Sequence, residues 1–324
     1  MVFLLDSMDL LLKMFNMGQL GSKLLLLVMK GFGRQPWWLL HLESSIIAGI
    51  MSSFGGYRRK IAIANLTRVF GQEKAIKLVS GFYRNFCDIT LESMKLFTVS
   101  EESLINRVEY SSKGLQLMNK LYDEDRVVIL AGGHMANWEM YAMTFSRKLK
   151  FDTMAIYKQL NDSLIDEEMR NSRERFGLKM VKISECRKWM EKHMTFSEKS
   201  RLAIGFGFDQ SPATAYKSWW TKFLGVETAV YFGVEKWAKD YNAAVVYGAV
   251  KRIGRGRYSV DFRLVKEHVQ DCKKGEVIDR CLCELEREIK EAPCDWLWSH
   301  KRWKHARPEG MIVQERRFEC KLDS

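Results

Sequence analysis

The feature that most constrains the fold is a short apolar run, Val127–Leu130, which ends in Ala131-Gly132-Gly133. A β-branched run that stops at glycines predicts a buried strand followed by a turn. Comparable runs predict further strands at 153–157, 202–208, 243–251 and 258–265, and the intervals 161–175, 184–195 and 228–241 have helical character. Strands that alternate with helices are typical of an α/β fold, so we expect a mixed, largely parallel sheet flanked by helices. The glycines in residues 253–257 predict a tight hairpin turn and one antiparallel pair.

The N-terminal part of the chain is predicted to be helical. Residues 57–98 form two periodic runs, and the first fifty residues contain the apolar runs Leu10–Leu12, Leu24–Met29 and Trp37–Leu40, broken by charged residues. These runs are too short for a spanning helix, which needs roughly 20 apolar residues. They suit amphipathic helices that lie in a membrane interface, although packing on the core would explain each helix equally well. Adjacent tryptophans beside Arg34 favour the membrane. We expect a membrane-associating region at 1–110 and an α/β core at 111–324.

The charge of the chain predicts an anionic partner. Fifty-two Lys and Arg against 40 Asp and Glu give a net charge of +12, which suits nucleic acid, an anionic lipid surface or an acidic carrier protein. No nucleic-acid-binding module accompanies the basic residues, so a nucleic-acid partner is not expected. The seven cysteines form no spaced framework, which favours a reducing, cytoplasmic environment. Their spacing matches no zinc pattern, and neither a metal nor a cofactor is expected.

The hexapeptide from His134 to Glu139 carries the main chemical prediction. If His134 lies in the turn after the strand and Asn137 caps the next helix, Glu139 falls in the first helical turn, where both side chains could converge. An imidazole oriented by a carboxylate can then act as a general base. The alternative is an ordinary buried histidine beside an ordinary capping glutamate, because short motifs recur by chance.

An ordered series of short motifs extends over nearly the whole chain. It comprises Gly56–Lys60 with Asn65-Leu66, Phe82–Phe86, Gly133-His134 with Asn137–Glu139, Arg173–Gly177, Asp209–Pro212, Phe223–Gly225 and Trp296–Lys304. In this series the chain resembles the lipid A biosynthesis acyltransferases, the late lauroyl and myristoyl transferases of Gram-negative bacteria. One departure is Tyr157-Lys158-Gln159, where the family commonly has an arginine followed by proline.

The resemblance implies direct attack of a lipid hydroxyl on an acyl thioester, with His134 and Glu139 as the catalytic pair. The sequence agrees, because it has no Gly-x-Ser-x-Gly elbow and no cysteine near His134. Arg173 is the candidate oxyanion donor, although it could be one charge on a solvated helix face. Lys158, Asn137 and the pair Asp209-Gln210 are candidate substrate-binding residues, although Asp209–Pro212 could be a plain β-turn.

These inferences together predict an acyltransferase on the cytoplasmic face of the inner membrane. The expected reaction moves a fatty acyl chain from acyl carrier protein to a hydroxyl of a lipid A precursor. Two alternatives remain open at this point. The same chemistry could serve another acceptor, such as an aminolipid or an aryl-polyene-type pigment, or the chain could be a non-catalytic basic protein that binds membranes or nucleic acid.

Overall fold

The computed structural model of the chain describes residues 18–316 apart from 54, 196–200 and 217. The predicted apolar run Leu10–Leu12 lies outside the described residues. Among the described residues, a seven-stranded sheet has the order β1-β9-β8-β2-β5-β3-β4, and β6 and β7 form a separate antiparallel pair. The strands of the large sheet are β1 (Val108–Tyr110), β2 (Val128–Gly132), β3 (Asp152–Tyr157), β4 (Lys179–Lys182), β5 (Leu202–Gly207), β8 (Ala244–Gly254) and β9 (Arg257–Lys266). Its neighbours pair in parallel except β8 with β9, so the expected mixed, largely parallel α/β sheet is confirmed.

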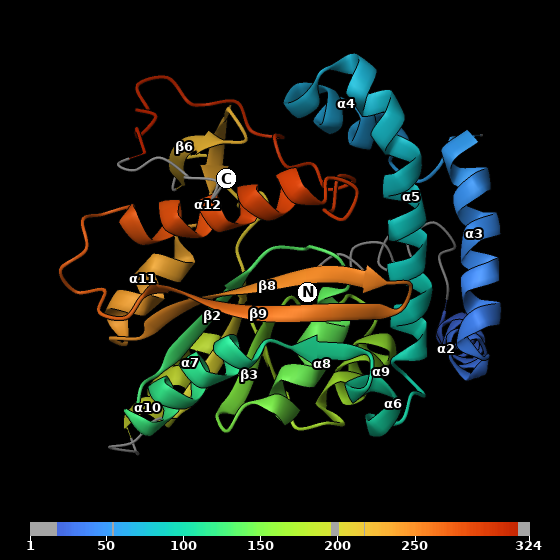
Figure 1. Cartoon of the computed structure of the whole chain (residues 1–324), viewed down its shortest axis with the longest axis horizontal. Coiled ribbons are helices and arrows are strands. Elements are labelled where there is room, and N and C mark those ends of the chain that lie inside the picture. Colours follow the sequence, from blue (N-terminus) through green and yellow to red (C-terminus); the bar gives the residue numbers. More distant parts are fainter. Residues whose placement is uncertain (1–17, 54, 196–200, 217, 317–324) are drawn as a thin grey trace.

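Helices cover both faces of this sheet, with α12 above it and α7 and α8 below it in the view of Figure 1. The helices of the core are α6 (Glu101–Ile105), α7 (Ser112–Asp123), α8 (Trp138–Lys148), α9 (Ser163–Glu174), α10 (Cys186–Thr195), α11 (Gly233–Asp240) and α12 (Glu276–Glu291). Alternate residues of β2 point to opposite faces. Ile129 therefore packs in the cluster that contains the apolar side of α12, while Val128 and Leu130 pack with α7 and α8. A strand buried on both faces accounts for the continuous apolar run in the sequence.

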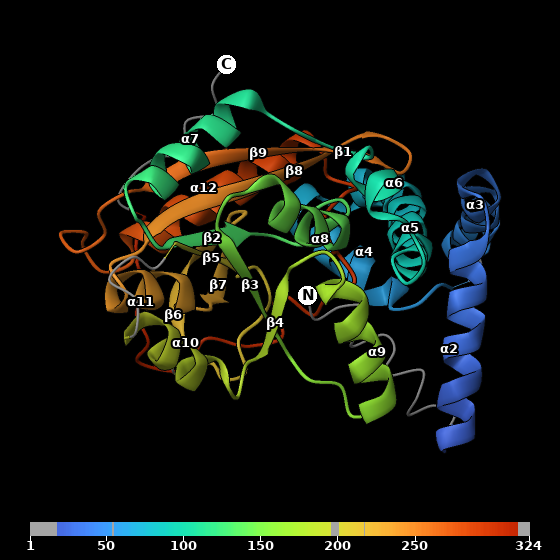
Figure 2. The same ribbon diagram turned by 90° about the horizontal axis from the view of Figure 1, so that it is seen from below.

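The N-terminal helices lie at one side of this core. They are α2 (Gln19–Arg34), α3 (Trp37–Ser53), α4 (Arg59–Phe70) and α5 (Gln72–Lys95). Both views show α2 and α3 on the outer side of α5 (Figures 1 and 2). Large apolar side chains are exposed on α2 and α3: Leu20, Leu24, Leu27, Val28, Trp38, Leu42, Ile46, Ile47 and Ile50. Within the described residues, none of the helices combines the length and the apolar character required to cross a bilayer.

The predicted helix at 228–241 is wrong in its first part. Residues Val226–Val230 form strand β7, which pairs with β6 (Trp219–Phe223), and the helix α11 begins only at Gly233. The connection between the two strands is Leu224-Gly225, and both residues have positive φ angles, 52° and 78°. Two residues with positive φ form the tight turn that matches the twist of a hairpin. The predicted turn near 253–257 is confirmed by the antiparallel pairing of β8 with β9.

Candidate active site

The site is built on the turn that joins β2 to α8. Gly133 lets the turn pack closely on α12, because a Cβ atom on this residue would lie 2.5 Å from the end of the Leu285 side chain, which would have to move. Ala136 has a φ of 45°, a conformation that costs a residue with a side chain roughly 1 to 2 kcal/mol. The amide of Ala136 donates to the carbonyl oxygen of Asp295 at 2.9 Å, so the C-terminal segment helps to hold this turn. The sequence thus folds into a fixed loop that presents His134 at the carboxyl end of β2.

His134 is paired with Asp209, which follows the neighbouring strand β5. Their Nδ1 and Oδ1 atoms are 2.6 Å apart, and the other carboxylate oxygen accepts hydrogen bonds from the His134 amide at 2.9 Å and the Trp296 indole at 2.8 Å. His134 and Asp209 are each only 3% exposed. Burial alone would raise the pKa of Asp209, but the His134 charge and these hydrogen bonds hold it below its ordinary value. The carboxylate therefore fixes the imidazole, with Nε2 as its second nitrogen.

One polar group beside that nitrogen is the amide of Gln210. Its Nε2 lies 3.4 Å from Nε2 of His134, and the side chain is half-buried. His134 also lines an apolar cavity of about 70 Å³ between β2, β5 and α8. Trp138, Tyr141 and Phe145 form its aromatic wall. A substrate with a polar reacting group beside Nε2 of His134 could therefore place an apolar chain in this cavity.

Glu139 and Arg173 form a second pair, in which each residue is 1% exposed. Nε and Nη2 of Arg173 both donate to Oε2 of Glu139, at 3.0 and 2.8 Å, and Nη1 donates to the sulfur of Met169 at 3.2 Å. Arg173 is thus not the solvated surface charge that one interpretation of its sequence allowed. Glu139 and Arg173 line a cavity of about 10 Å³, separate from the one lined by His134. Oε1 of Glu139 is buried and has no hydrogen-bond partner in the described part of the chain.

The structure places the remaining predicted residues differently. Asn137 caps α8 as expected, since its Oδ1 accepts from the Met140 amide at 3.0 Å. Its side chain is fully buried and its amide nitrogen donates to Glu92 at 2.7 Å, so both polar atoms already bond protein groups. Lys158 is exposed just beyond the end of β3. Over the described ranges, no three His, Cys, Asp or Glu side chains gather as metal ligands would.

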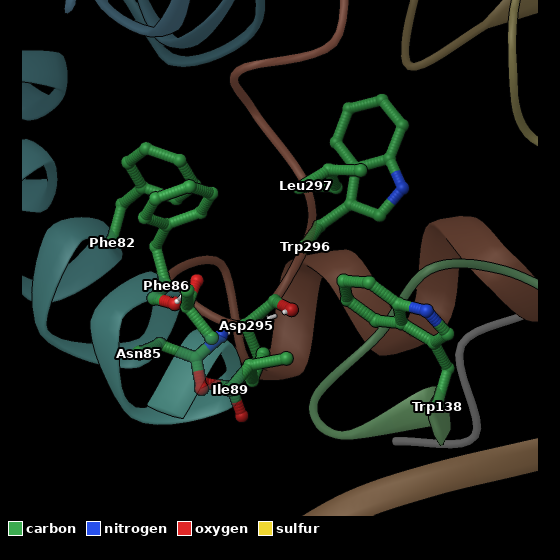
Figure 3. Close-up of a pocket in the computed structure, with 9 residues that line it drawn as sticks. Phe82, Asn85, Phe86, Ile89, Trp138, Asp295, Trp296 and Leu297 are labelled. Carbon is green, nitrogen blue, oxygen red and sulfur yellow. Dashed lines mark hydrogen bonds between the residues drawn. The ribbon is translucent and has the colours of Figure 1, made fainter. Parts of the chain in front are cut away.

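A narrow slot on the other side of Trp138 connects the loop with α5. Figure 3 shows Phe82, Phe86 and Ile89 of α5 facing the segment 295–297, with Trp138 at the far side. Trp296 connects this slot with the His134 site, because its indole donates a hydrogen bond to Asp209. His300 supports the same turn, accepting from the Ser211 amide at 2.9 Å, and burial lowers its pKa to about 3. Both residues lie in a motif that marks the resemblance, but that motif does not reveal their partners.

The chain was compared with known protein families and with curated proteins. A family model of bacterial lipid A biosynthesis acyltransferases matches residues 18–305, which include every residue of the site described above. No match was found among curated proteins. Because the family model covers most of the 324 residues, the chain belongs to the bacterial lipid A biosynthesis acyltransferase family and is an acyltransferase.

Proposed function

We propose that His134 is the general base in the transfer of a fatty acyl chain from acyl carrier protein to a hydroxyl of a lipid A precursor. The family implies a lipid A precursor as the acceptor and an acyl donor. The observation that carries the proposed mechanism is the buried contact between Nδ1 of His134 and Asp209 at 2.6 Å, with Nε2 beside an apolar cavity. A carboxylate on Nδ1 holds the tautomer whose Nε2 can accept a proton.

In this mechanism Nε2 of His134 removes the proton of the acceptor hydroxyl while the hydroxyl oxygen attacks the carbonyl carbon of the thioester. The carbonyl oxygen takes up negative charge, and the carbon–sulfur bond then breaks as the carbonyl re-forms. The imidazolium returns its proton to the departing thiolate, so the products are an ester and the thiol of the carrier. Asp209 stabilises the imidazolium between these two proton transfers.

The other predicted residues have distinct places in this proposal. The Gln210 amide contacts the acceptor or the developing oxyanion, because it lies 3.4 Å from the reacting nitrogen. Glu139 keeps a catalytic role through Oε1, since an unsatisfied buried oxygen is expected to find a substrate or water partner. Arg173 holds Glu139, and its Nη1 is the proposed oxyanion donor because the sulfur of Met169 is a weak acceptor. This role requires that the cavity lined by Arg173 and Glu139 join the one lined by His134 when the substrates bind. Lys158 offers its exposed charge to an anionic part of a substrate.

The outer faces of α2 and α3 are proposed to lie in the membrane interface. Leu20, Leu24 and Leu27 of α2 are 82%, 58% and 63% exposed, and on α3 Trp38 is 68% exposed. Spacings of three and four residues place such side chains on one face of a helix. An apolar face with a tryptophan suits a headgroup boundary, where the acceptor lipid resides. The cytoplasmic face of the inner membrane is the proposed location, because acyl carrier protein would be available there.

Mass spectrometry of total lipids tests the reaction. A deletion strain should accumulate a lipid A precursor that lacks one acyl chain, and the wild-type gene should restore the acylated form. A His134→Ala gene expressed at the same level should not restore it. If the missing mass belongs to an aminolipid or a polyene pigment instead, the assigned acceptor is wrong.

A further inference from the structure

We propose that Glu92 is a positioning residue that sets the catalytic loop through Asn137. This inference rests on the function proposed above. It concerns a residue on α5, whereas His134 and Asp209 lie just after the strands β2 and β5. Glu92 is completely buried, as is Asn137. Its Oε2 accepts a hydrogen bond from Nδ2 of Asn137 at 2.7 Å.

Glu92 joins three separate parts of the fold. The same Oε2 atom accepts from the hydroxyl of Tyr258 in β9 at 2.6 Å, and Oε1 lies 3.0 Å from Nε2 of His41 in α3. Burial, followed by the Glu92 charge, raises the pKa of Tyr258 well above its ordinary value, so the hydroxyl stays a donor. A buried carboxylate is costly unless several donors surround it. Its three partners therefore hold Glu92 in one place against the loop.

The bond to Asn137 fixes which way its side-chain amide points. With Nδ2 directed at Glu92, Oδ1 is directed at the Met140 amide and caps α8. The cap lies between the base and the carboxylate: His134 is three residues before it, and Glu139 is two residues after it. A flipped amide would put a donor against the first amides of the helix and would leave Glu92 facing an oxygen. The orientation of Asn137 thus determines how α8 begins and where the residues on either side of it lie.

The polarity of this contact gives a reciprocal test. In Asn137→Asp, a second buried carboxyl group would face Glu92 across 2.7 Å, and the two would repel each other at any pH above that at which the pair takes up a shared proton, while the oxygen that caps Met140 is kept. Glu92→Gln alone can keep an oxygen towards Asn137 and Tyr258 and turn its amide to His41, whose tautomer can change. In the double variant Glu92→Gln/Asn137→Asp, the glutamine amide can donate to the aspartate, so the hydrogen bond is restored with its direction reversed.

Steady-state kinetics of the purified full-length chain, with acyl carrier protein thioester and a lipid A precursor, separates positioning from binding. We expect Asn137→Asp to lower kcat by about 10²-fold with little change in KM, the size of effect that a displacement of about 1 Å can produce. Glu92→Gln should stay within about threefold of wild type, and the double variant should recover most of the kcat lost by Asn137→Asp. Such recovery is the coupling expected of residues in direct contact.

The matched control is Tyr258→Phe, which removes another hydrogen bond from the same oxygen of Glu92 but leaves the Asn137 contact intact. It should lower the melting temperature and leave kcat within a few-fold of wild type. If Asn137→Asp does not fold, Asn137→Ser tests the same contact, because serine can still cap the start of α8 and loses only the hydrogen bond to Glu92.

Additive losses in the double variant, or an Asn137→Ser variant with the kcat of Tyr258→Phe, would overturn the positioning role. His134→Ala in the same assay reports on the proposed function alone. Full turnover in that variant would contradict the catalytic base, whereas the Glu92 results bear only on positioning.

Discussion

Replacing Asp209 by Asn should disable the base while leaving the fold nearly unchanged. The side chain keeps its size, and one oxygen can still accept from the Trp296 indole, which lies 2.8 Å from the carboxylate. The charge that stabilises the protonated His134 is lost. Two unit charges about 4 Å apart attract each other by about 4 kcal/mol at an effective dielectric constant of 20. Each 1.4 kcal/mol changes a rate about tenfold, so kcat should fall by about 10³-fold.

The assay is steady-state acyl transfer by purified protein, with melting temperature measured on the same samples. Glu235→Gln is the matched control, because Glu235 is also fully buried and accepts from backbone amides of Gly275 and Val277 at 2.8 and 3.1 Å. These amides lie at the start of α12 and are not part of the loop that carries His134. Glu235→Gln should therefore reduce stability without a comparable loss of kcat. An Asp209→Asn enzyme that keeps kcat within threefold of wild type would refute the assignment of this carboxylate.

Three further predictions concern the second ion pair, the membrane and pH. Arg173→Met leaves Glu139 buried without its cation and should lower the free energy of unfolding in urea by about 3 to 5 kcal/mol. Adding Glu139→Gln should recover part of this loss, and a loss under about 1 kcal/mol in Arg173→Met would contradict the prediction. Serine at both Leu42 and Ile46, which are 52% and 57% exposed, should weaken liposome sedimentation without changing the melting temperature, and unchanged sedimentation would show that the anchor lies elsewhere. Burial raises the pKa of Glu288 from 4.5 to about 8, so the stability associated with its neutral form is complete below pH 4.5 and declines as pH rises to about 8. Glu288→Gln should remove this decline from the free energy of unfolding measured at a series of pH values, and an unchanged pH profile would contradict the prediction.

The sequence was sufficient to predict the parts of the fold that depend on local patterns. The run at Val127–Leu130 is continuous because β2 is buried on both faces, and the glycines around Ile253 coincide with the hairpin of β8 and β9. The β6–β7 hairpin was missed because its turn begins with Leu224, which adopts a positive φ of 52° without being a glycine or asparagine. The short strand β4 was missed as well, because four residues carry too little periodicity. The division of the chain near residue 110 stays a prediction.

The partners within the site depend on contacts between distant segments. His134 and Asp209 are 75 positions apart, and Glu139 and Arg173 are 34 apart. The spacing of His134 and Glu139 suggested that these two side chains contact each other. In the structure the imidazole contacts Asp209 instead, and Glu139 pairs with Arg173. Only the order of the strands shows this, because β2 and β5 are neighbours and their carboxyl ends lie together. Ligands of α/β sheets bind at such ends, which is why the general location could be predicted and the pairing could not.

The most direct test of the central claim is the turnover of His134→Ala with acyl carrier protein thioester and a lipid A precursor. The variant should fold, because the change removes one buried side chain from a loop that the Ala136 and Asn137 contacts also hold. If His134 is the general base, kcat should fall by about 10² to 10⁴-fold, the usual contribution of such a group. The melting temperature should fall as well, because Asp209 stays buried without the imidazole, but the protein should remain folded at the assay temperature. A folded His134→Ala protein with near wild-type turnover would contradict the account.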